Sequence, residues 1–77
     1  MSDVDKVLGY AEILIARTEK NFEGTPPVMI AFTMTSVCNA LANILLSPTI
    51  TQQQLEKSVL LRKRERKIKE RLDLKAF

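Results

Sequence analysis

The run LRKRERKIKERLDLK, residues 61–75, is the most highly charged segment of the chain and the one whose side chains could do chemistry. On a helix of 3.6 residues per turn, Arg64, Lys67 and Arg71 form one basic stripe, with Lys63 beside it. Guanidinium and ammonium groups bind phosphates and carboxylates, so such a stripe suits a nucleic acid or an acidic protein. We predict that five cations of this run contact a partner: Arg62, Lys63, Arg64, Lys67 and Arg71.

Acidic residues within the same run bear on the choice of partner. Glu65 precedes Lys69 by four residues, and Arg66 precedes Glu70 by four, so both pairs can stabilise an exposed helix by a few tenths of a kcal/mol. These acids would repel phosphates, and the run has no Asn, Gln, Ser or Thr to read base edges. We therefore favour a protein partner with an acidic surface. A nucleic-acid contact is the alternative, and a solvated helix face without any partner fits the same pattern.

The apolar residues of this run form a narrow line. Leu61, Ile68 and Leu72 share one side of a helix, with Glu65 on the same line. This line predicts a short seam for a dimer or a partner. Because the apolar face is broader before Leu61, we expect the first half of the helix to pack in the core and the second half to leave it as an arm.

Catalytic groups are scarce in this sequence. The chain has no His, which is the commonest general base, and its two glycines form no phosphate-binding loop. The single Cys38 has no charged neighbour in sequence to activate it, and Cys/His zinc sets are absent. We predict a non-enzymatic protein with no catalytic residue, no metal site and no cofactor.

Helical signals divide the chain into three segments of one all-α domain over residues 1–77. We predict helices over about residues 3–21, 26–46 and 52–76. Ser2 is a suitable N-cap for the first helix, and Thr25 with Pro26 suits the start of the second. Thr51 with Gln54 has the spacing of a capping box for the long basic third helix, and Thr49 with Gln52 matches equally well.

The middle segment carries no charge over residues 24–55 and is apolar almost all round. Such a helix is either central to a core or within a membrane. We favour a buried helix over a membrane span, because Asn, Ser and Thr interrupt the segment and aromatic anchors are missing from its ends. Ser36, Asn39 and Asn43 lie on one stripe, where they either hydrogen-bond across a dimer or face solvent.

A chain of 77 residues has little core to rely on, since a domain this small buries only about 60% of its unfolded surface. One cysteine cannot form an internal disulfide, and two amphipathic helices cannot easily cover an apolar third. We therefore expect a helical homodimer or docking on a partner. The acidic N-terminus lacks the pattern of a signal peptide, and with the unpaired cysteine it predicts a cytoplasmic protein.

The stretches VLGYAEILIARTEKNF and AFTMTSVCNAL, with the uncharged middle and the basic end, resemble the cytoplasmic lysis-inhibition accessory proteins (RIII) of T-even phages. The resemblance implies binding to a cytosolic part of the holin and no enzymatic activity, and it assigns no role to any single residue. With the charge pattern, it predicts a small bacteriophage regulatory protein that binds a protein partner through helical surfaces.

Overall fold

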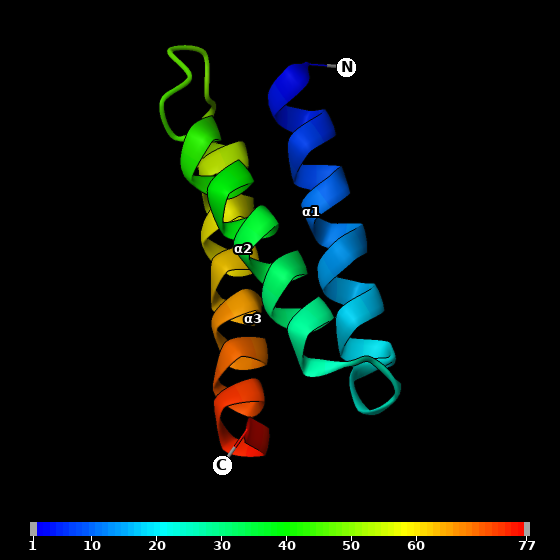
Figure 1. The fold of residues 1–77 in the computed structure, drawn as a ribbon. Helices are drawn as coiled ribbons and strands as arrows, with labels where there is room; N and C mark the ends of the chain where they lie inside the picture. Colours follow the sequence, from blue (N-terminus) through cyan, green and yellow to red (C-terminus); the bar gives the residue numbers. More distant parts are fainter. Residues whose placement is uncertain (1, 77) are drawn as a thin grey trace.

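The computed structural model describes residues 2–76, and for Ala76 the backbone alone. Over this range the chain forms three α-helices and one 3-10 turn, with no strand (Figure 1). The elements are α1 (Asp3–Lys20), η1 (Phe22–Gly24), α2 (Pro27–Ile44) and α3 (Gln52–Ala76). The predicted all-α class with a long basic third helix is thus confirmed.

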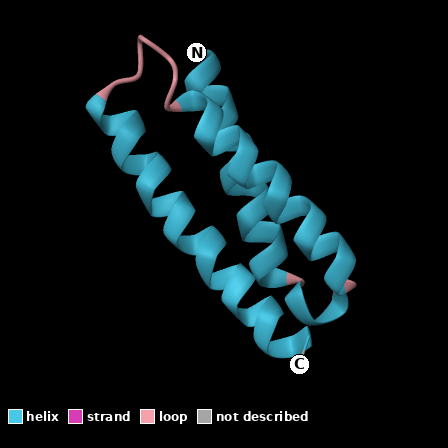
Figure 2. Ribbon diagram, turned by 60° about the vertical axis from the view of Figure 1, so that its left-hand side comes forward, coloured by secondary structure: helices cyan, strands magenta, loops and turns pink. Residues whose placement is uncertain are grey.

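The helices form a bundle in which each one packs against the other two. The chain reverses direction at both connections, so α2 runs antiparallel to its neighbours while α1 and α3 run parallel (Figures 1 and 2). The bundle measures 41 × 19 × 16 Å along its principal axes. The parallel arrangement brings the acidic N-terminal helix alongside the basic C-terminal helix.

Capping hydrogen bonds hold the starts of α1 and α3. The backbone N–H of Asp5 donates to the Ser2 hydroxyl at 3.2 Å, as predicted. Thr51 and Gln54 form the reciprocal capping box, with bonds of 2.9 and 3.2 Å, so Thr51 rather than Thr49 precedes α3. The Gln54 amide also donates to Asp5 Oδ1 at 3.0 Å, which ties the two helix starts together.

The start of α2 differs from the prediction by one residue. The Thr25 hydroxyl donates to the Asn21 carbonyl at 2.7 Å and so makes no cap, while Pro26 takes the N-cap position and Pro27 begins the helix. Proline suits this place because the first turn of a helix leaves backbone N–H groups unpaired anyway.

The core lies along the axis of the bundle. On α1 and α2 the core residues recur at helical spacing, and Leu61 and Ile68 of α3 complete the core. The buried apolar residues are Val4, Leu8, Ala11, Ile15, Phe22, Ile30, Met34, Val37, Leu41, Ile44, Leu61 and Ile68.

The prediction that Leu61, Ile68 and Leu72 form a free seam for a dimer or a partner is therefore wrong. Leu61 and Ile68 are only 3% and 1% exposed within the single chain, and Leu72 is half-buried against the same core. The second half of α3 does not leave the bundle as an arm, because the end of α1 and η1 pack beside it. Phe22 is buried there, with the Arg71 guanidinium 4.0 Å from its ring centre.

Within the single chain α2 is only partly covered, as expected from two neighbouring helices that cannot enclose an apolar third. One stripe of the helix enters the core, and the opposite stripe, which includes Ser36, Asn39 and Asn43, is exposed. These three polar residues face solvent in the single chain. By length and composition α2 could cross a membrane, although core helices of soluble proteins meet the same criterion.

Candidate interaction surfaces

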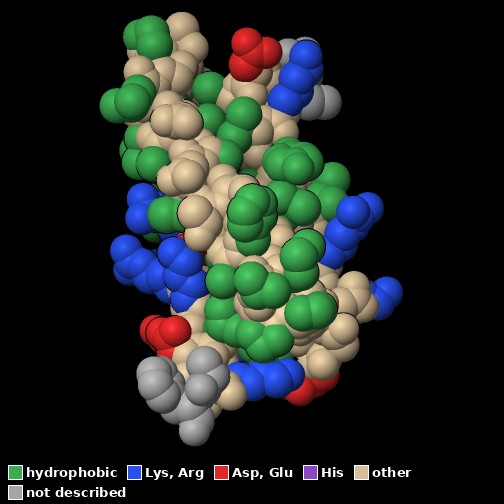
Figure 3. All heavy atoms as spheres, in the orientation of Figure 1, with side chains coloured by type: hydrophobic (Ala, Val, Ile, Leu, Met, Phe, Trp, Pro, Cys, Tyr) green, Lys and Arg blue, Asp and Glu red, His purple; other side chains and the backbone are tan. Residues whose placement is uncertain are grey.

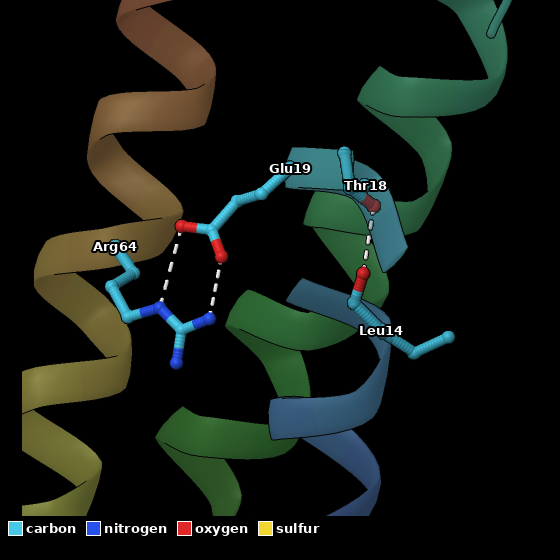
Figure 4. A network of polar contacts seen from close by, with 4 residues as sticks. All are labelled: Leu14, Thr18, Glu19 and Arg64. Carbon is cyan, nitrogen blue, oxygen red and sulfur yellow. Dashed lines mark hydrogen bonds and ion pairs between the residues drawn. The ribbon is translucent and has the colours of Figure 1, made fainter. Parts of the chain in front are cut away.

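Many charges of α3 are paired with acids of α1 and η1. Lys57 Nζ lies 2.8 Å from Glu12 Oε2. The Arg64 guanidinium makes a bidentate contact with Glu19, in which Nε donates to Oε2 at 3.3 Å (Figure 4). Further along, Glu23 meets both Arg71 at 3.6 Å and Lys75 at 3.0 Å. We call this set of pairs the α1–α3 charge ladder.

The ladder follows from parallel packing and helical spacing. Glu12 and Glu19 are seven residues apart, as are Lys57 and Arg64, so each pair of like charges lies on one side of its helix. Two parallel helices then bring the acids and the cations to the same heights. The acidic and basic ends of the sequence therefore compensate each other inside one molecule.

The predicted uncompensated stripe is accordingly broken up. Arg64 and Arg71 are ion-paired within the chain, and among the three stripe residues Lys67 alone has no ion pair inside residues 2–76. Pairing along the sequence could not reveal this, because the acids come from an element more than 40 residues away.

Three carboxyl groups on this side have lowered pKa values. The side-chain hydrogen bond from Gln54 lowers the pKa of Asp5, helped by Ser2. Hydrogen bonds and attraction from Lys57 lower the pKa of Glu12, and those from Lys75 do the same for the pKa of Glu23.

One predicted pair along α3 is present and the other is not. Lys69 Nζ lies 2.8 Å from Glu65 Oε1, and the hydrogen bond to Glu65 raises the pKa of Lys69. Glu65 is 2% exposed and therefore belongs to the interior. Arg66 and Glu70 form no ion pair in the part of the chain that the structure describes.

The cations of α3 that remain without an ion pair across residues 2–76 are Arg62, Lys63, Arg66 and Lys67. Sequence reasoning assigned Arg66 to an internal pair and so missed it. Three of the four, Arg62, Lys63 and Arg66, line a groove of about 280 Å³ together with Leu45, Leu55, Ser58 and Val59. We call it the α2–α3 groove.

A second surface is apolar. Tyr10 and Ile13 of α1 are 61% and 52% exposed, and Val28, Met29 and Phe32 of α2 are 72%, 53% and 73% exposed. In Figure 3 hydrophobic side chains gather over α2 and the adjoining part of α1, with cations at the margins. We call these five residues the α1–α2 apolar face. The sequence predicted that part of α2 would stay uncovered, but it did not indicate which of its residues or that Tyr10 and Ile13 of α1 would be exposed too.

Chemistry of other kinds finds little support in the described residues. No group of three or more His, Cys, Asp or Glu side chains is placed to hold a metal ion there. Cys38 is a free thiol, half-buried on α2. Comparisons with protein-family models, curated proteins and solved structures found no match to this chain.

Proposed function

We propose that this chain is a small, non-enzymatic, cytoplasmic regulatory protein that acts by binding other proteins through its helical surfaces. The observation that carries the proposal is the α1–α2 apolar face. Its five large apolar side chains are each more than half exposed, and Figure 3 shows hydrophobic side chains gathered over α2 and the adjoining part of α1. Contiguous apolar patches of this kind mark interaction sites on soluble proteins.

We propose further that a second copy of the chain packs on this face to form a homodimer. The outward side of α2 carries no charge, so two copies can meet there without burying an unpaired charge. A two-fold dimer uses the same patch on both copies, which suits a face of uniform chemistry. Dimer formation would also enlarge a core that is small for a lone domain.

The resemblance to lysis-inhibition accessory proteins supports a specific form of this proposal. In that form the partner is a cytosolic part of a phage holin, and binding delays host-cell lysis. An acidic partner surface would meet the cations of α3 that have no ion pair within residues 2–76. Resemblance is the sole support for the biological process.

Two alternatives have weaker support. A nucleic-acid contact through α3 would rely on its cations, but Lys57, Arg64, Lys69, Arg71 and Lys75 are each paired with a carboxylate. A membrane span would use α2, but that helix buries a stripe of core residues against α1 and α3.

Replacing Phe32 by Glu tests the apolar face, because a charge would then stand in place of its most exposed side chain. We expect the wild-type protein to sediment as a dimer without detergent, and the variant to dissociate about 30-fold more readily, since an aromatic anchor contributes about 2 kcal/mol. Analytical ultracentrifugation over a range of concentrations measures this.

Leu74→Glu is the matched control, since Leu74 is a similarly exposed apolar residue of α3 outside the face. It should leave the dimer intact. A wild-type protein that stays monomeric at high concentration would contradict the homodimer, and one that pellets without detergent would favour the membrane alternative.

A further inference from the structure

We infer that the α2–α3 groove binds a carboxylate-bearing amphipathic segment of another protein. The inference rests on the proposed protein-binding function but concerns a different surface from the α1–α2 apolar face. The groove runs between Leu45, just after α2, and the first half of α3.

The positive charge of the groove indicates that its ligand carries an anionic group. Arg62, Lys63 and Arg66 line it, no acidic residue does, and none of the three forms an ion pair within residues 2–76. Of the other cations of α3, all but Lys67 are paired in the charge ladder or with Glu65. Three of the four α3 cations without an ion pair within residues 2–76 therefore line this groove, and their charge selects an anionic group.

Two buried polar atoms in the groove also indicate an anionic ligand. Ser58 is 1% exposed and its hydroxyl has no hydrogen-bond partner in the described chain, and Arg62 Nε is likewise buried without a partner. Native proteins pair nearly all such groups. Arg62 as a whole residue is only half-buried, so a carboxylate arriving from solvent can accept from its guanidinium in a charge-assisted bond. Ser58 lines the same groove, and its hydroxyl is a second donor without a partner there.

Apolar side chains narrow the ligand class. Leu45, Leu55 and Val59 line the same groove, and Leu45 and Val59 remain 41% and 47% exposed. A free inorganic anion or a nucleic-acid backbone would leave these side chains in water. A protein helix with Asp or Glu beside Leu or Ile would cover them and bring the carboxylate to Arg62.

The test uses two capped synthetic helical peptides that differ only in Glu or Gln beside their Leu residues. Each is titrated into ¹⁵N-labelled full-length protein and followed by NMR. We expect the Glu peptide to shift the amide signals of Leu45, Val59 and Arg62, and to bind at least tenfold more tightly than the Gln peptide. Equal binding of the two peptides, or shifts confined to Tyr10, Ile13 and Phe32, would overturn the inference.

Variants distinguish a binding site from a purely structural role. Arg62→Gln should weaken binding of the Glu peptide at least tenfold, whereas Lys20→Gln, an exposed cation of α1, should leave it unchanged. Ser58→Ala should weaken binding about threefold while raising the melting temperature, because it removes an unpaired buried hydroxyl.

A loss of folding cannot explain a Ser58→Ala protein that binds the peptide more weakly and yet melts at a higher temperature. An Arg62→Gln or Ser58→Ala protein that binds the Glu peptide as wild type does would overturn the site. The Phe32→Glu protein should bind this peptide normally, so failure of the groove and failure of the apolar face are separately visible.

Discussion

Glu65 is a carboxylate in the core of the bundle, held by one lysine from the next turn of α3. It is 2% exposed, while the Lys69 side chain, 2.8 Å away, is 45% exposed. Removing a carboxylate from water costs several kcal/mol, and a close cation offsets much of that cost. The pair therefore holds α3 in one rotation about its axis, with Glu65 inward and Lys69 at the rim.

Replacing Lys69 by Gln should leave Glu65 buried without its cation. We expect the free energy of unfolding to fall by about 1–3 kcal/mol, less than for a fully buried pair because Lys69 is partly solvated. Urea denaturation measures the change. Adding Glu65→Leu to the same protein should recover most of the loss, and a single variant as stable as wild type would show that the pair contributes nothing.

Gly9 lies in the interior of α1, and a Cβ atom added there would meet nothing within 4 Å. Gly9→Ala should therefore raise the free energy of unfolding by about 0.5–1 kcal/mol, since alanine loses less backbone entropy in a helix. Thermal denaturation measures it. Ala16→Gly, at an exposed site of the same helix, is the matched reverse change and should lower stability by a similar amount. A loss of stability in Gly9→Ala would mean that another surface packs against this position.

At the scale of the elements, α1 and α3 recognise each other by charge as well as by apolar packing. The charge ladder runs along their parallel faces from Glu12 to Glu23, and the bond from Gln54 to Asp5 joins their starts. Each contact is exposed and individually weak. Together they favour the parallel alignment over a slipped one, because a shift along the axis would separate acids from cations.

Acid should weaken this alignment. The folded pKa values of Asp5, Glu12 and Glu23 lie below their ordinary values, so unfolding takes up protons at low pH. The stability that these groups contribute is fully present above pH 4.5 and is lost as the pH falls through their lowered folded pKa values. We expect the urea midpoint to decrease from pH 4.5 to pH 3.

A Glu12→Gln, Glu23→Gln protein should show a smaller decrease over the same pH interval, because it lacks two of the carboxylates with lowered pKa values. Glu70→Gln is the control, since Glu70 is exposed and has no ion pair within residues 2–76. An unchanged pH dependence in the double variant would show that the ladder contributes nothing to stability. High salt should reduce the difference, since exposed pairs are screened.

At the scale of the whole molecule, the bundle divides its surface into three regions of different chemistry. One side carries the charge ladder, in which charges compensate each other. The α1–α2 apolar face carries no charge, and the α2–α3 groove combines apolar residues with cations that have no ion pair in the described chain. Two of the three regions are thus suited to contacts with other molecules, which agrees with the non-enzymatic binding role that we propose.

The helices and most of their ends could be predicted from the order of residues along the chain. Apolar periodicity, the Ser2 cap and the Thr51–Gln54 box act within a turn or two, so they can be read locally, and the pair of Glu65 with Lys69 is equally local. The exception at Thr25 is local too, since its hydroxyl bonds backward to Asn21 rather than forward.

Which surfaces stay free depends on how the three helices pack against one another. The direction of packing set Glu19 against Arg64 and Glu23 against Arg71, so the stripe expected from α3 alone was largely neutralised. It also turned Leu61 and Ile68 into the core and left Phe32 outside. These outcomes depend on how distant segments lie against each other, and helical periodicity gives the faces of a helix without saying which neighbour each face will meet.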